Sequence, residues 1–115
     1  MQRSGATSRQ PAELVQGTLD MLVLKTLALE PLHGFGIAIR IEQISSGVFR
    51  VNPGTLFVAL KRLEREGLID SEWRTTENHR RAKYYTLAPA GRRRLDAERR
   101  AWSRQVTAIK RILEA

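Results

Sequence analysis

The stretch that decides the fold is VNPGTLFVALKRLEREGLIDSEW, residues 51–73, where a short cationic segment runs directly into a β-prone one. Asn52 is a favourable N-cap, Pro53 suits the first helical position, and Gly67 stands where a C′ glycine commonly ends a helix. These three signals predict a helix over residues 53–66. Apolar and polar residues alternate over residues 68–74, which predicts a strand directly after the helix.

The predicted helix has two chemically different faces when its residues are placed about 100° apart. One face is apolar and consists of Leu56, Ala59, Leu60 and Leu63. The opposite face is short or basic and centres on Gly54, Val58, Lys61 and Arg65, with Arg62 beside it. The apolar face can anchor the helix in a core, while the short, basic face leaves room for close approach to a DNA groove.

Other roles for the outer face stay open at this point. A basic helix face is often merely solvated, and Glu64 and Glu66 would weaken the patch if they paired with the neighbouring bases. Val58 is equally compatible with a core or dimer contact. The order of the surrounding elements therefore has to decide between these alternatives.

Two further helices are predicted before this one. Apolar residues recur at helical spacing over residues 13–30, where Pro31 ends the pattern, and again over residues 34–46. His33 precedes the second pattern and is expected to be a turn or cap residue. Residues 1–12 have no apolar period, and we expect a disordered arm there.

A hairpin is predicted after the cationic helix. A polar turn over residues 75–81 separates the first β-prone run from a second one at 82–87. Trp73, Tyr84 and Tyr85 are expected to pack within the hairpin and the core. The segment 74–83 would form a basic wing whose cations follow a DNA backbone, and these are Arg80, Arg81 and Lys83.

The last segment, residues 89–115, predicts a long helix with an apolar seam. Leu95, Trp102 and Ile109 fall on one position of a heptad frame, and Arg99, Val106 and Leu113 on the other. So long a seam cannot pack wholly against so small a domain, which predicts a partner helix, most simply that of a second chain.

These elements predict a mainly α fold with a small β-hairpin, a winged helix-turn-helix plus a C-terminal dimerisation helix. The expected divisions are an arm at 1–12, a winged-helix DNA-binding domain at 13–88 and a dimerisation helix at 89–115. In such a fold the third helix enters the major groove and the hairpin lies along the adjacent backbone. The helix N-terminus at Asn52 and Thr55 can also receive a phosphate oxygen.

Composition supports a polyanionic partner. The 115 residues hold 20 Lys and Arg against 12 Asp and Glu, a net charge of +8. Residues 1–49 hold four bases and four acids, so the excess lies after residue 49. Double-stranded DNA is favoured, with an anionic membrane surface as the lesser alternative. No apolar run is long enough for a membrane span and no signal peptide is recognised, so we expect a cytoplasmic protein.

No enzymatic constellation is found. Cysteine is absent, and the two histidines, His33 and His79, have no carboxylate or hydroxyl at a recognised catalytic spacing. Two histidines are also too few for a convincing metal cluster, so we expect neither a metal nor a cofactor.

At these residues the chain resembles the PadR family of bacterial transcriptional regulators. The resemblance rests on QGTLDMLVLKTLALEPLHGFGI for the first two helices, GTLFVALKRLEREGLI for the third, and RRAKYYTLAPAGRRRL for the second wing strand and last helix. It implies a homodimer of winged-helix domains that usually represses transcription from palindromic promoter sites. The single C-terminal helix is similar to the short subgroup of the family.

Position by position, the resemblance implies roles for individual residues. DNA contacts fall on Asn52, Thr55, Phe57, Lys61 and Arg62, and wing contacts on His79, Arg80 and Arg81. Dimerisation falls on the first helix, including Leu19 and Leu22, and on Leu95, Trp102, Val106, Ile109 and Leu113. Phe57-Val58 stands where the family commonly has Tyr-Pro, Phe35 where it has Tyr, and Ala88 where it has a capping Thr.

Family members also bind small aromatic molecules between their subunits, which makes Trp102 the candidate contact for such an effector. The alternative is that Trp102 only fills the dimer seam. The leading hypothesis is thus a homodimeric, sequence-specific repressor of transcription that a small aromatic ligand relieves. A winged-helix module that binds a protein, with solubilising arginines, is the rival from another class.

Overall fold

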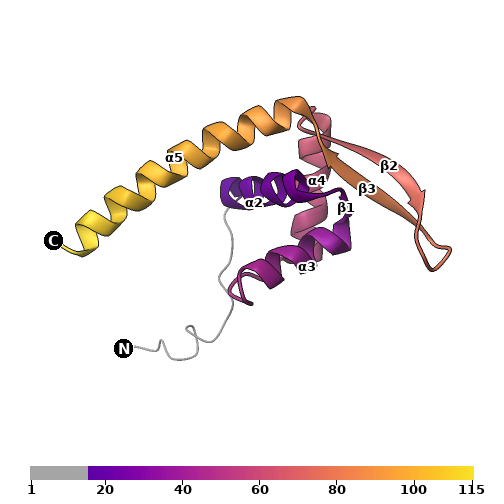
Figure 1. The fold of residues 1–115 in the computed structure, drawn as a ribbon, viewed down its shortest axis with the longest axis horizontal. Helices are drawn as coiled ribbons and strands as arrows, with labels where there is room; N and C mark the ends of the chain where they lie inside the picture. Colours follow the sequence, from indigo (N-terminus) through magenta and orange to yellow (C-terminus); the bar gives the residue numbers. More distant parts are fainter. Residues whose placement is uncertain (1–15) are drawn as a thin grey trace.

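The structure is a computed structural model that describes residues 16–115. The expected arm at 1–12 lies outside the described residues, as do the first residues of the expected first helix. The elements of the described chain are, in order, α2 (Gln16–Leu29), β1 (Leu32–His33), α3 (Gly34–Ile44), α4 (Pro53–Arg65), β2 (Ile69–Thr75), β3 (Arg81–Leu87) and α5 (Pro89–Leu113) (Figure 1). The predicted mainly α fold with a β-hairpin is confirmed.

Local capping signals place the two helices of the helix-turn-helix. Asn52 is the N-cap of α4, and its side-chain oxygen accepts a hydrogen bond from the Thr55 amide at 3.1 Å. His33 caps α3 in the same way, because its Nδ1 accepts from the Gly36 amide at 3.0 Å. Gly67 follows α4 with φ of +77°, a left-handed conformation that glycine adopts without strain.

The sheet has one strand more than the sequence predicts. The predicted hairpin of β2 and β3 is present, and β1 adds to its free edge, giving the antiparallel order β1-β3-β2. Leu32 is paired with Tyr85 and His33 with Tyr84. A strand of two residues leaves no periodic pattern, so only the fold reveals it. It fastens the start of α3 to the base of the wing.

The core lies between α2, α3, α4 and the base of the sheet. The predicted apolar face of α4 is buried there, together with Leu19, Val23, Leu24 and Leu27 of α2, Ile37 and Ile41 of α3, and Leu95 of α5. Removing one such leucine from water contributes about 1.5–3 kcal/mol. This core fixes the inner face of α4 and leaves its outer face free.

Only the first turns of α5 belong to the core. Gly91 must be glycine, because a Cβ there would overlap the backbone carbonyl of Leu68. The N-cap residue Ala88 makes no side-chain capping bond. The C-terminal turns of the helix extend away from the other elements (Figure 1). Within residues 16–115 no helix combines the length and apolar character needed to cross a membrane.

Candidate nucleic-acid interface

The outer face of α4 is open to solvent. Gly54, Lys61 and Arg65 are exposed, and Val58 at the centre of this face is 67% exposed. The neighbouring Phe57 crosses from α4 to the start of α3, where a Cβ on Gly34 would lie only 3.0 Å from its ring. The expected separation into a buried apolar face and an exposed short or basic face is therefore confirmed.

Arg62 departs from the expectation that it contacts DNA. Its two terminal nitrogens donate to both carboxylate oxygens of Asp20 in α2, each at 2.8 Å. The two side chains are only 19% and 7% exposed. The hydrogen bonds to Asp20 raise the pKa of Arg62 still further, although partial burial opposes the rise. Arg62 therefore fastens α4 to α2, and its guanidinium is not free for a phosphate.

Glu64 fastens the opposite side of α4 to the hairpin. Its carboxylate accepts a hydrogen bond from the Ser71 hydroxyl and pairs with Lys83 at 3.3 Å. The bond from Ser71, followed by Lys83, lowers the pKa of Glu64. Glu64 thus pairs with a wing base rather than with its neighbours on α4, and Lys83, which was expected on DNA, holds the wing against the helix.

The wing tip is exposed and basic. His79, Arg80 and Arg81 are all exposed, and His79 adopts a left-handed conformation with φ of +60°. The turn is closed by hydrogen bonds between Thr76 and Arg80 and from the His79 amide to the Thr76 carbonyl. These three side chains are brought to one end of the molecule, as the sequence predicted for a wing.

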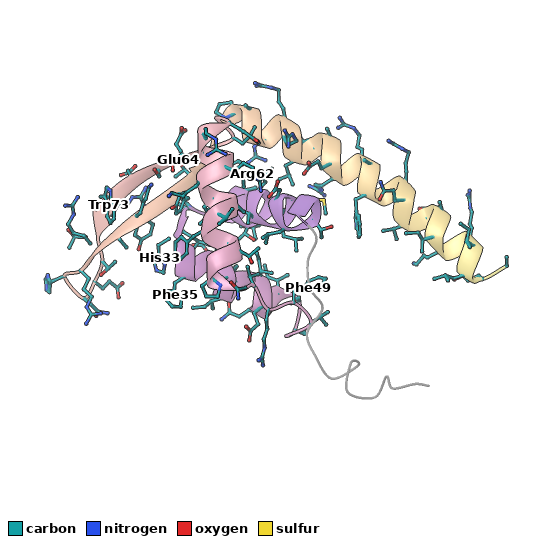
Figure 2. The ribbon with its side chains drawn as sticks, turned by 180° about the vertical axis from the view of Figure 1, so that it is seen from behind. His33, Phe35, Phe49, Arg62, Glu64 and Trp73 are labelled. Atoms are coloured by element: carbon teal, nitrogen blue, oxygen red, sulfur yellow. The ribbon has the colours of Figure 1, made fainter. Side chains whose placement is uncertain are left out.

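The aromatic residues of the hairpin differ in burial. Tyr85 is buried as predicted. The half-buried Tyr84 packs edge to face against His33, with the two ring centres 5.4 Å apart. Trp73 packs within the hairpin as predicted, against Arg81, but the prediction that it also reaches the core is wrong, because the residue is 59% exposed. The guanidinium carbon of Arg81 lies 5.4 Å from the centre of its ring. Figure 2 shows Trp73 on the wing, away from Glu64 and Arg62 of α4.

Two of the expected dimerisation residues belong to the chain's own core. Leu19 is 2% and Leu95 is 1% exposed, since both belong to the hydrophobic core of the chain. This corrects their assignment, because neither side chain offers surface to a second chain. Leu22 and Val106 are half-buried, and the remaining three residues, Trp102, Ile109 and Leu113, are exposed.

A groove runs between α2 and α5 at the expected effector residue. It has a volume of about 260 Å³ and is lined by Gly17, Thr18 and Met21 of α2 and by Glu98, Ala101, Trp102 and Gln105 of α5. Burial raises the pKa of Glu98, partly offset by Arg94. Among residues 16–115, no group of three or more His, Asp or Glu side chains is placed to hold a metal ion.

Comparison with known proteins agrees with this architecture. The model of the transcriptional regulator PadR-like family matches residues 23–97. An uncharacterized 37.1 kDa protein of transposon TN4556 from Streptomyces fradiae is 43% identical over 85 residues, which are 74% of this chain and 23% of that protein. The transcriptional regulator Rv3488 of Mycobacterium tuberculosis is 35% identical over 89 residues, covering 77% of this chain and 79% of that one.

The fold comparison gives the same answer. The crystal structure of a PadR family transcription regulator from Clostridium difficile matches with a TM-score of 0.72 and 27% identity, covering 83% of this chain and 97% of that one. This family and these named regulators act on transcription and are not enzymes. Since the family model covers more than half of the sequence, the chain belongs to the PadR-like family of transcriptional regulators.

Proposed function

We propose that this regulator is a homodimer that binds a palindromic promoter site in double-stranded DNA and represses transcription there. In this proposal α4 enters the major groove and the wing follows the adjacent backbone. The observation that carries it is the outer face of α4, which is open and basic while the inner face is buried. The proposal places the protein in the cytoplasm, with the chromosome.

Charge and local geometry support DNA as the partner. The chain has a net charge of +8, and the exposed cations Lys61, Arg65, Arg80 and Arg81 lie on α4 and the wing. The amides at the start of α4, near Asn52 and Thr55, add a partial positive charge beside them. Gly54 leaves the backbone of the first turn open to close approach.

The first experiment selects the purified protein against a random duplex library at near-physiological salt. A two-fold symmetric enriched motif is expected from a dimer with one α4 in each half-site. A flat salt dependence with no motif would instead favour a protein partner for Phe57 and Val58, because only phosphate contacts release counterions.

Single substitutions then test α4. Lys61→Ala should weaken binding by about 1–3 kcal/mol with altered preference at one base pair if Lys61 reads a base, or should reduce the salt slope by about one if it meets a phosphate. Lys110→Ala removes the same charge near the C-terminal end of α5 and should change neither the affinity for DNA nor the salt slope. Native binding by the Lys61 variant would refute the placement of α4 in the groove.

The proposed dimer uses the outer part of α5. This helix of 25 residues is about 37 Å long, and its exposed apolar stripe begins at Trp102, beyond the chain's own core. Val106→Glu should yield monomers in sedimentation, whereas Thr107→Glu adds the same charge one residue away, outside the seam, and should leave the dimer intact. A dimer unaffected by the Val106 change would move the interface elsewhere.

We extend the proposal to a small aromatic effector in the groove between α2 and α5. The support is that Trp102 lines the groove beside Met21 and Glu98. A panel of small planar aromatic compounds should contain members that raise the melting temperature of the native protein and weaken its operator binding. Trp102→Ala should abolish both effects, and equal effects in that variant would remove Trp102 from the effector site.

A further inference from the structure

One face of the hairpin, the inner wing face, is turned toward α4. It consists of Ser71, Trp73, Thr75, Arg81 and Lys83. These residues share a face because Trp73 is paired with Lys83 and Thr75 with Arg81, and strand residues two apart point to the same side. The face is turned toward α4 because Ser71 and Lys83 both contact Glu64.

Trp73 lies on this face where α4 no longer covers it. Along β2 it is two residues beyond Ser71, which is about 7 Å nearer the wing tip. Trp73 is 59% exposed, although the contacts that Ser71 and Lys83 make with Glu64 hold the base of the wing against α4. Trp73 therefore lies on the wing beyond the contacts with Glu64, away from α4 (Figure 2).

Arg81 places a positive charge next to this exposed ring. Its guanidinium carbon lies 5.4 Å from the centre of the Trp73 ring, within range of a cation–π interaction. Arg81 remains exposed, so its guanidinium can still donate to an acceptor outside the chain. Stacking on an indole also limits the rotamers of the arginine, so less entropy is lost when it binds a partner.

The chemistry of the pair selects its partner. A broad apolar ring with a single N–H donor, next to a stacked guanidinium, matches a surface that alternates flat apolar groups with anionic oxygens. The deoxyribose–phosphate backbone of DNA is such a surface. Arg80, exposed next to Arg81 at the wing tip, adds to the positive potential that a backbone requires.

We propose that Trp73 and Arg81 together form a backbone clamp, in which the indole packs on a deoxyribose and the guanidinium binds the adjoining phosphate. This inference rests on the proposed function and adds Trp73 to its site. With α4 in the major groove, the inner wing face is turned to the strand that borders this groove. Trp73 then fixes the distance of the wing from the duplex, and Arg81 supplies the charge.

The two tryptophans of the chain make this contact directly observable. Trp102→Phe leaves Trp73 as the sole indole, and Trp73→Phe leaves Trp102 as a matched control. Each variant is titrated with the selected operator duplex while labelled-duplex anisotropy reports binding and acrylamide quenching reports access to the indole. Trp73 should lose most of its access to acrylamide on binding, and Trp102, on α5, should keep the access it has in the free protein.

Affinity separates the roles of the two residues. Trp73→Ala should weaken operator binding about tenfold without changing its salt slope, because the indole is uncharged. Arg81→Ala should weaken binding and reduce the slope by about one. A structural role for Trp73 would lower the melting temperature of the Ala variant but would not protect the native indole in the complex.

The outcomes distinguish this inference from the function on which it rests. Native affinity for the duplex with Trp73 equally open to acrylamide in both states overturns the clamp and leaves DNA binding intact. Absence of duplex binding by the native chain removes both. Incorporating 5-fluorotryptophan into the unsubstituted protein gives the same test by fluorine NMR, so the result does not depend on how either variant folds.

Discussion

Replacing Arg62 with methionine tests the reassignment of this residue from DNA to the protein's own framework. The substitution keeps most of the aliphatic stem but removes both 2.8 Å hydrogen bonds to Asp20. The Asp20 side chain is only 7% exposed, so its carboxylate would remain desolvated and without its cation. Breaking a buried pair from one side costs about 3–5 kcal/mol. Because the Arg62 side chain is 19% exposed, we expect the lower end, about 3 kcal/mol.

Urea unfolding followed by circular dichroism measures this cost. All variants must be compared at one protein concentration, because dissociation of an oligomer adds to the apparent stability. With a slope of about 1.5 kcal/mol/M for a domain of this size, a loss of about 3 kcal/mol lowers the midpoint by about 2 M. The double variant Asp20→Met, Arg62→Met leaves no unpaired charge and should recover most of the loss.

A different result would return Arg62 to the DNA interface. The framework role of Arg62 would be refuted if Arg62→Met lost less than about 1 kcal/mol in the free energy of unfolding while its operator affinity fell and the salt slope dropped by about one. Arg65→Met is the matched control, because Arg65 is exposed on the same helix. Its stability should stay within about 0.5 kcal/mol of the native protein.

Three further predictions concern individual contacts. Asn52→Ala removes the side-chain acceptor for the Thr55 amide and should lower the free energy of unfolding by about 1 kcal/mol. Asn52→Asp keeps the acceptor and should lower it far less. Equal losses in the two variants would contradict the capping role of Asn52. Gly91→Ala places a methyl group against the Leu68 carbonyl and should lower the free energy of unfolding in urea by about 1–3 kcal/mol. Gly17→Ala, where the added methyl group meets open space, should leave the free energy of unfolding nearly unchanged. Folding lowers the pKa of Glu64, so the ionised carboxylate stabilises the folded state above pH 4.5, the usual pKa of this group, and this contribution is lost as the pH falls further. Glu64→Gln should therefore reduce the loss of unfolding free energy in acid. An unchanged acid dependence would contradict the role of the hydrogen bond from Ser71.

The parts of the fold that follow from local chemistry could be predicted from the sequence. Asn52, Pro53 and Gly67 bracket α4 because capping depends only on residues next to the helix ends. The inner and outer faces of α4 follow from helical spacing alone. The wing was recognisable because a polar turn separates two β-prone runs of similar length.

The parts of the fold that depend on residues distant in the sequence could not be predicted from it. Arg62 lies beside the outer face on a helical wheel, but Asp20, 42 residues earlier, draws its side chain toward α2. Leu95 fits a heptad seam, yet the close approach of Gly91 to Leu68 brings it into the core. Trp73 has the period of a packed strand residue, and only the length of the wing beyond α4 leaves it in solvent.

The small strand β1 also has a consequence for the order in which the protein is made. Leu32 is paired with Tyr85, so the two sides of this ladder are 53 residues apart in the sequence. During synthesis from the N-terminus, α2 and α3 leave the ribosome well before β3 exists to receive β1. Contacts of such long range are intrinsically late in folding. We therefore expect the helix-turn-helix and the wing to reach their final arrangement only after β3 has emerged, so that α2 and α3 wait for a strand made much later.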